Sequence, residues 1–432
     1  MFKELKIKKK SIYAVLFIIV FKFILEYGYI SFVNPLYEYS GFSLNISSIK
    51  IIESYLLVIV ISTILVQFDK YDKPSKVVIY ILFINLYLPL SSLYWLQDNS
   101  RPFYLLISIS IISLCLFLMK VKVIRIQSLR EGNNITFLLL IGITIIVYGY
   151  LLITGGIQRV NFNLMDVYGV REDYSLISNR LFGYLVPWQA NIINLFFLIY
   201  GIIKRSKNII FVSVFLQLFL FSMTNFKSFL FSPLVVLGIY MIFKKGLKNN
   251  LLLTITIILS LFSSLLLIFS KITGDIILLS IFLRRLFFVP AKLHFQYFDF
   301  MENMEKYKLS HSILSGFVTN PYGIGPVELV SNNLFENGGN PNVGVFGDSF
   351  VNFGFAGVLL FTMILGFILL VLDSVASNSP SILSMSIIII PSMSLINSAL
   401  FTSLATHGIL FSILIIWLTS SLFRIDERNK LY

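Results

Sequence analysis

Long apolar runs, separated by short polar segments, recur along the whole chain. A helix that crosses a bilayer needs roughly 20 mostly apolar residues, and its backbone must satisfy its own hydrogen bonds inside the lipid. The pattern therefore predicts an all-α polytopic membrane protein with about twelve transmembrane helices in one integral membrane domain, 1–432. These helices are expected at 11–33, 51–68, 77–96, 103–119, 136–154, 182–203, 209–223, 228–243, 251–270, 355–372, 381–401 and 408–423.

The loops between the predicted helices differ in charge. Lys and Arg concentrate in four short loops, around 70–76, 120–130, 204–207 and 244–248. Such an excess marks the cytoplasmic side of a membrane protein. Both termini are predicted on that side, which requires an even number of spans. The 373–380 loop carries no Lys or Arg, so its place on that side follows from parity alone.

Two segments on the opposite side are longer than a simple connection requires. They cover 155–181 and 271–354. Long loops in a compact fold are usually functional or disordered. The second contains LLSIFLRRLFFVPAKLHFQYFDF, which is too aromatic and apolar for disorder. We expect this piece to lie at the membrane interface or to pack in a cavity at membrane depth.

Composition narrows the class of protein further. The chain is 57% hydrophobic and carries a formal charge of +13, which in a membrane protein mostly fixes topology and gives no reason to expect nucleic acid. Cys115 is the single cysteine, so no disulfide framework or thiolate metal cluster is expected. The basic and then apolar N-terminus lacks a small-residue cleavage site and is interpreted as an uncleaved first helix.

The two long segments carry arginines on the side where few cations are expected. An arginine at membrane depth needs water or a partner, and its planar fork binds phosphate through paired hydrogen bonds. These residues therefore predict an anionic ligand such as a diphosphate, unless they pair with nearby acids or reach lipid headgroups. They are Arg159, Arg171, Arg180, Arg284 and Arg285.

The stretch NPNVGVFGDSFVNFGFAGVL, 340–359, ends the second long segment and enters a predicted span. It holds Asn342 and a lone carboxylate, Asp348. This carboxylate is either a helix cap or a base that accepts a proton from a sugar hydroxyl. We expect Asn342 and Asp348 to face a cavity shared with Arg171, Arg284 and Arg285, and we read Gly354 and Gly357 as packing glycines.

Three histidines complete the candidate chemistry. His311, in KLSHSILSG, and His407, in ATHG, are each either structural or a base near neutral pH, and the third is His294. The chain has no HExxH motif, CxxC pair, P-loop or Rossmann fingerprint. No metal and no cofactor are therefore predicted.

Four stretches together carry a resemblance to a known family. They are DVYGVREDYS followed by GYLVPWQANIIN, then MTNFKSFLFSPL, FLRRLFFVPAKLHFQYFDF and NPNVGVFGDSFVNFGFAG. In this order and with these loop sizes, over about 155–360, the chain resembles the Wzy-type oligosaccharide repeat-unit polymerases of bacterial surface-polysaccharide assembly. The RX10G pattern of that family is not kept, because eleven residues separate Arg171 from Gly183.

The resemblance implies a GT-C-like glycosyltransferase of the bacterial inner membrane, with both long segments in the periplasm. It implies an undecaprenyl-diphosphate-linked oligosaccharide as substrate, membrane lipid around it, and a chain-length-regulating co-polymerase as a partner. Arg171 and the Arg284–Arg285 pair match the family's periplasmic arginines. We expect an inverting transfer, independent of metal, in which Asp348 or His311 is the base and Arg180 and Asn342 help to bind substrate.

Two other functions remain open at this stage. O-antigen ligases share the large outer loop, but they resemble HNxxL before the glycines, where this chain reads NVGVF. Lipid-linked oligosaccharide flippases have a similar number of spans, but they usually place charged residues near the membrane midplane.

Overall fold

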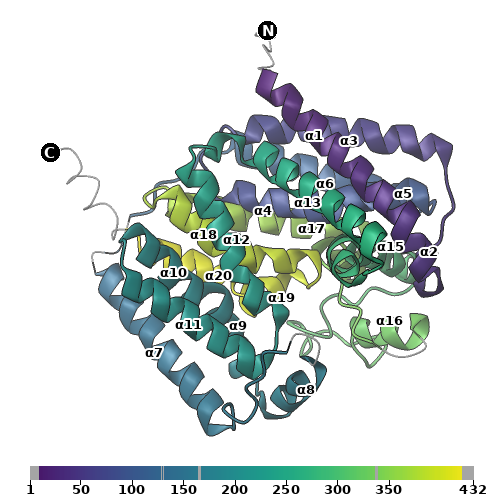
Figure 1. Ribbon diagram of the computed structural model, residues 1–432. Helices are drawn as coiled ribbons and strands as arrows, with labels where there is room; N and C mark the ends of the chain where they lie inside the picture. The colour runs from purple at the N-terminus through teal and green to yellow at the C-terminus, as the bar shows by residue number, and fades with distance from the viewer. Residues whose placement is uncertain (1–8, 128, 130, 164–166, 336–338, 421–432) are drawn as a thin grey trace.

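The computed structural model describes residues 9–127, 129, 131–163, 167–335 and 339–420 (Figure 1). All regular secondary structure in these residues is helical. The first ten α-helices are α1 Lys9–Gly28, α2 Asn34–Tyr37, α3 Ser48–Phe68, α4 Ser75–Ile81, α5 Leu88–Leu96, α6 Arg101–Lys120, α7 Gly132–Ile153, α8 Val167–Ile177, α9 Phe182–Trp188 and α10 Asn194–Ile203.

The second half of the chain continues the bundle. Its α-helices are α11 Lys207–Thr224, α12 Lys227–Lys244, α13 Leu251–Thr273, α14 Ile277–Leu279, α15 Val289–Met301, α16 Pro326–Leu334, α17 Val345–Ala376, α18 Ser381–Met393, α19 Leu400–Ala405 and α20 Ile409–Leu418. Short π or 3-10 segments join or extend several of them: η1 Tyr29–Val33, η2 Glu38–Ser40, η3 Leu82–Tyr87, η4 Gln189–Ile193, η5 Lys248–Asn250, η6 Ser280–Phe288 and η7 Ser394–Ile396.

Eleven helical segments among the described residues are long and apolar enough to cross a membrane, against about twelve predicted. The chain is therefore an α-helical, multi-pass membrane protein. The predicted span at 381–401 differs: the apolar helix there covers only Ser381–Ile396, and the next span is Leu400–Leu418. Most of α18 is buried against other helices. A broken helix is tolerated at membrane depth when protein surrounds it.

Helix α17 begins at Val345, ten residues before the predicted span at 355. Its N-cap residue is Gly344, so Asp348 lies inside the first turn and is not the cap. A kink interrupts the helix at Phe353 and Gly354, where Gly354 has φ +62° and ψ −145°. That conformation is essentially restricted to glycine. Gly354 therefore makes the kink, and the packing role predicted for it is incomplete.

The second long segment is folded and does not form an open loop. It contains α14, η6, α15, α16 and the first turns of α17. Phe298 of α15 lies 4.7 Å from Phe103 of α6 and 4.6 Å from Phe350 of α17, measured between ring centroids. This aromatic packing places α15 in the core of the helical bundle, whereas the sequence predicted a position at the membrane interface or in a cavity at membrane depth. In Figure 1, α8 and α16 lie at the lower edge of the bundle and α2 at its right.

The loops rich in Lys and Arg meet at one end of the bundle, here called the basic end. Lys248 Nζ lies 2.8 Å from Asp72 Oδ2, and Lys76 Nζ donates to the Lys248 carbonyl over 3.0 Å. Asp373, near the last turn of α17, accepts hydrogen bonds from the backbone N–H and the hydroxyl of Ser75. The 377–380 turn joins them, because Asn378 Nδ2 donates to the Ile126 carbonyl over 2.8 Å. The first turn of α17 is therefore at the opposite end.

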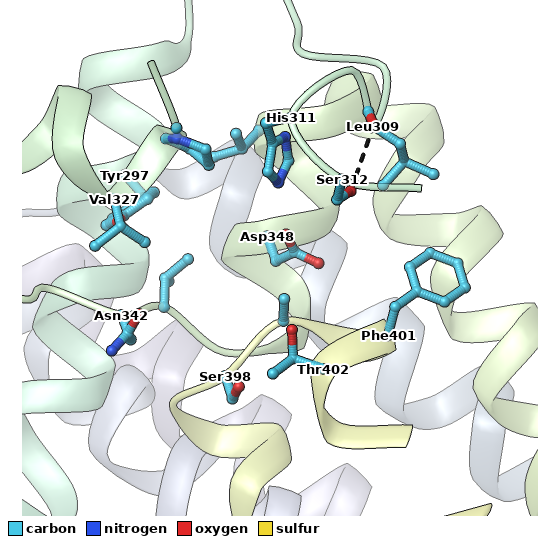
Figure 2. A pocket seen from close by; sticks show the side chains of 15 residues that line it. Tyr297, Leu309, His311, Ser312, Val327, Asn342, Asp348, Ser398, Phe401 and Thr402 are labelled. Carbon is cyan, nitrogen blue, oxygen red and sulfur yellow. Dashed lines mark hydrogen bonds between the residues drawn. The ribbon is translucent and has the colours of Figure 1, made fainter. Parts of the chain in front are cut away.

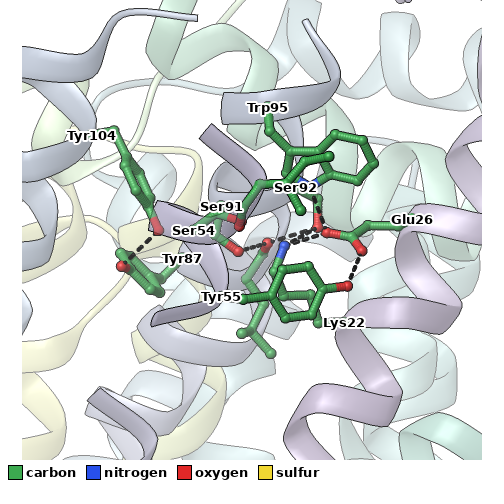
Figure 3. Close-up of polar contacts among 11 residues, drawn as sticks. Lys22, Glu26, Ser54, Tyr55, Tyr87, Ser91, Ser92, Trp95 and Tyr104 are labelled. Carbon is green, nitrogen blue, oxygen red and sulfur yellow. Dashed lines mark hydrogen bonds and ion pairs between the residues drawn. The ribbon is translucent and has the colours of Figure 1, made fainter. Parts of the chain in front are cut away.

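A buried ion pair ties α1 to α3 and α5 (Figure 3). Lys22 and Glu26, one turn apart on α1, are paired and almost fully buried. Glu26 also accepts hydrogen bonds from Trp95 Nε1, over 2.8 Å, and from the Tyr55 hydroxyl. A charged pair in a membrane span is stable only when such partners satisfy it.

Candidate functional site

A cavity of about 310 Å³ lies beside the first turn of α17, at the end opposite the basic end. Figure 2 shows His311 above Asp348, with Asn342, Ser398 and Thr402 around the same space. The walls come from α15, the 309–312 segment, α17 and the broken region between α18 and α19. Asp348, His311 and Asn342, which the sequence singled out from distant positions, therefore line one cavity.

Asp348 is buried at the wall of this cavity. Its Oδ1 accepts a hydrogen bond from Asn352 Nδ2 over 3.1 Å, and its Oδ2 accepts one from the Leu400 backbone N–H over 3.3 Å. Among the described residues no lysine or arginine forms a salt bridge with it. The carboxyl group is thus oriented by neutral donors at the cavity wall.

His311 is half-buried, and its Nδ1 has no hydrogen-bond partner among the described residues. The edge of its ring packs on Tyr307, with ring centroids 5.2 Å apart. Burial lowers the pKa of His311 below its ordinary value of 6.5. The imidazole is therefore neutral at pH 7 and can accept a proton.

Asn342 closes the cavity on one side, in the turn that precedes α17. This turn is held from α15, because the Tyr297 hydroxyl donates to the Pro341 carbonyl over 2.7 Å. Tyr297 itself lines the cavity, so it contributes both to the wall and to the placement of Asn342.

None of the predicted arginines lines this cavity. The chain therefore does not form the single cavity, shared by Asp348, Asn342 and the arginines, that the sequence predicted. Arg284 is half-buried in η6, where its guanidinium carbon lies 4.0 Å from the Tyr37 ring centroid and its Nε donates to Ser280 Oγ over 3.1 Å. Arg285, next to it, is exposed.

Lys292, which the sequence analysis missed, joins Arg284. It is buried on α15, donates to the Ser40 carbonyl and lies 4.5 Å from the Phe42 ring centroid. Burial, with a smaller contribution from the charge of Arg284, lowers the pKa of Lys292 to about 8. Because the positive charge of Arg284 acts on Lys292, an anion bound beside both side chains would offset their repulsion. The signal for Lys292 in the sequence was its place inside the apolar run FFVPAKLHF.

The remaining three arginines lie in the first long segment. Arg159 donates from Nη1 to the Thr154 carbonyl. Arg171 of α8 donates from Nε to the Asn225 carbonyl over 3.0 Å, and its guanidinium carbon lies 5.1 Å from the Phe226 ring centroid. Arg180, just before α9, is exposed. Asp166, one of the acids considered as a partner for these arginines, lies outside the described residues.

The other two histidines do not contribute to the cavity wall. His294 is fully buried on α15, and burial lowers its pKa to about 4. His407 lies in the turn between α19 and α20. The described part of the chain contains no group of three or more His, Cys, Asp or Glu side chains that could hold a metal ion.

The comparisons with known proteins identify no relative of this chain. The chain matches no protein-family model, and no curated protein and no solved structure matches it. The fold and the site thus define a multi-pass α-helical membrane protein with a cavity that contains Asp348, His311 and Asn342 at the end opposite its basic loops.

Proposed function

We propose that the protein is a polymerase that joins undecaprenyl-diphosphate-linked oligosaccharide repeat units into O-antigen or a related surface polysaccharide. One observation carries this proposal: a carboxylate, Asp348, and a neutral imidazole, His311, face one cavity at the end of the bundle opposite the basic loops. On the positive-inside rule this end is the periplasmic side of a bacterial inner membrane, and both termini are cytoplasmic.

The reaction we propose is an inverting glycosyl transfer. A hydroxyl of the acceptor sugar attacks the anomeric carbon of the donor, and the bond from that carbon to the diphosphate oxygen breaks. His311 or Asp348 takes the hydroxyl proton, and the lipid diphosphate leaves with the bonding electron pair. The donor already carries its leaving group, so the step requires no nucleotide. We propose that Asn342 and the hydroxyls around the cavity hold the sugars by hydrogen bonds.

The diphosphate requires positive charge, which we assign first to Arg284 and Lys292. Helix α15 carries both Lys292 and Tyr297, a residue of the cavity wall. Five residues correspond to about 7.5 Å along a helix axis and about 140° around it, so we propose that the lipid-linked oligosaccharide extends around α15 to reach both sites. Three further candidates for contact with phosphate are Arg285, Arg171 and Arg180. Arg285 and Arg180 are exposed, and Arg171 and Arg180 belong to the first long segment.

The experiment that tests this function is deletion of the gene, followed by separation of the surface polysaccharide on a gel. A polymerase predicts loss of the ladder while a single repeat unit is still attached to its final carrier. Loss of all attached sugar, including the single unit, would overturn the proposal in favour of a ligase or a flippase.

A further inference from the structure

The kink in α17 anchors the segment that carries His311. Beside the kink, the carbonyl of Val351 accepts a hydrogen bond from the Tyr307 N–H over 3.1 Å. The carbonyl of Asn352 accepts one from the Lys308 N–H over 3.0 Å. The chain 44 residues earlier is thus bonded to the backbone of α17 at the point where the helix changes direction.

The side chain of Asn352 adds a second connection and is fully buried. Its Nδ2 donates to both the carbonyl and the Oδ1 of Asp348, over 2.9 and 3.1 Å. Its Oδ1 accepts a hydrogen bond from the Leu309 N–H over 2.9 Å. One amide therefore contacts the carboxylate in the cavity and the backbone two residues before His311.

The anchored segment is held in a disfavoured conformation. Lys308 and Leu309 have φ values of +53° and +60°, in the left-handed region that residues with a side chain rarely adopt. Such a conformation persists only where the surroundings determine it, and it concentrates at functional sites. Here the three hydrogen bonds from α17 are the surroundings that fix it.

We propose that Asn352 is a positioning residue that holds Asp348 and the His311 segment in one arrangement, with the kink at Gly354 supplying the backbone acceptors. This inference rests on the proposed function only for what the arrangement does in the reaction. The placement of His311 against α17 is independent of any reaction. Asn352 acts through its neighbours, since it is absent from the cavity lining.

The test compares Asn352→Leu, which keeps the approximate size and removes the polar atoms, with a matched control, Asn333→Leu. Asn333 also donates from Nδ2 to the carbonyl four residues earlier, over 2.8 Å, but on the exposed face of α16. One readout is the ring titration of His311 by NMR in the detergent-solubilised full chain. The other is the polysaccharide ladder when each variant replaces the chromosomal copy.

In Asn352→Leu we expect the His311 titration to move up towards that of a solvent-exposed histidine, and the ladder to fall at least tenfold. Asn333→Leu should change neither. The titratable groups around His311 are Asp348 of α17, Tyr297 of α15 and Tyr307 of its own segment. An unmoved His311 titration in Asn352→Leu overturns the positioning role, whatever the polysaccharide shows. A moved titration with a full ladder supports the positioning role and instead overturns the proposed function of the cavity.

A second variant covers the case in which Asn352→Leu fails to accumulate. Asn352→Asp keeps the acceptor for the Leu309 N–H but sets a carboxylate against Asp348, and two carboxylates at this distance share a proton. We expect a wild-type His311 titration with at least a tenfold loss of polymer, because the shared proton occupies Asp348. A full ladder at wild-type protein level would contradict the role of Asn352 towards Asp348.

Discussion

Asp348 and Asp373 are buried carboxylates at opposite ends of one helix, α17, roughly 37 Å apart for an unbroken helix. Asp348 faces a cavity, whereas both oxygens of Asp373 are bonded to Ser75 at the basic end. Asp348 thus lines a cavity that is open to a ligand, whereas Asp373 holds the Ser75 segment in place. This contrast supplies a control for the chemistry proposed at Asp348.

Substitution of the kink glycines should destabilise the fold. A Cβ at Gly357 would lie 2.2 Å from the Ser349 carbonyl oxygen, and Gly354 has positive φ, so Gly354→Ala should cost about 1–3 kcal/mol and Gly357→Ala a similar amount. Thermal unfolding in detergent measures the loss. The control is Gly149→Ala in α7, where a Cβ meets nothing within 4 Å and should leave stability unchanged or raise it by up to about 1 kcal/mol. Equal effects at all three positions would contradict the backbone argument.

Removal of one member of the buried ion pair should be more damaging than removal of both. Lys22→Met leaves Glu26 buried without its cation, and such a change costs about 3–5 kcal/mol. In the double variant Lys22→Met, Glu26→Gln we expect most of that loss to be recovered, because no uncompensated charge remains. The measurement is again thermal unfolding in detergent. If the double variant were less stable than Lys22→Met, the two side chains would not be acting as a pair.

Binding of a diphosphate should depend on pH through Lys292. Because burial lowers the pKa of Lys292 to about 8, the side chain is charged below this pH and loses its charge as the pH rises through it. The affinity for a short-chain prenyl diphosphate should be constant below about pH 8 and fall about tenfold per pH unit above it. Lys292→Arg should remove the fall.

The control for this measurement is Lys271→Gln, which changes an exposed lysine near the end of α13. It should leave the affinity and its pH profile unchanged. Wild-type binding that persists without change to about pH 10 would exclude Lys292 from the anion site.

The fold followed from the sequence wherever a helix is surrounded by lipid, because lipid requires an apolar surface and internal backbone hydrogen bonds. The prediction differed at two segments that protein surrounds, although the buried span Ser75–Leu96 was predicted at 77–96. The first turns of α17 contain Asp348 and Asn352, whose polarity is typical of a loop when their partners from distant segments are unknown. The second segment is α18, which was predicted to extend to 401 but ends at Met393, with η7 following up to Ile396.

The candidate site was predicted in part. Asp348 and Asn342 line one cavity, as the sequence predicted, and His311, which was considered only as an alternative base, lines the same cavity. The arginines lie elsewhere, because charge alone does not say which helix a segment packs against. Lys292 and Asn352 were missed, since their roles depend on Ser40 and Leu309, which are remote from them in the sequence.

The two possible bases should be separable by substitution of His311. A base must be neutral or anionic to accept a proton, and burial lowers the pKa of His311 below 6.5. If His311 is the base, polymer formation in membrane vesicles should fall as the pH drops through that lowered pKa, and His311→Gln should lose about 10²–10⁴-fold. An active His311→Gln variant would leave Asp348 as the base.

The most direct test of the central claim is complementation of the deletion strain with Asp348→Asn, with Asp373→Asn as the matched control. Both changes remove one buried carboxylate from α17, and protein level in the membrane is measured for each. We expect Asp348→Asn to leave a single repeat unit without a ladder, at normal protein level, while Asp373→Asn restores the ladder in proportion to the protein present. A full ladder with Asp348→Asn would contradict the role of Asp348, and a full ladder with Asp348→Asn and His311→Gln together would contradict the assignment of this cavity as the site of polymerisation.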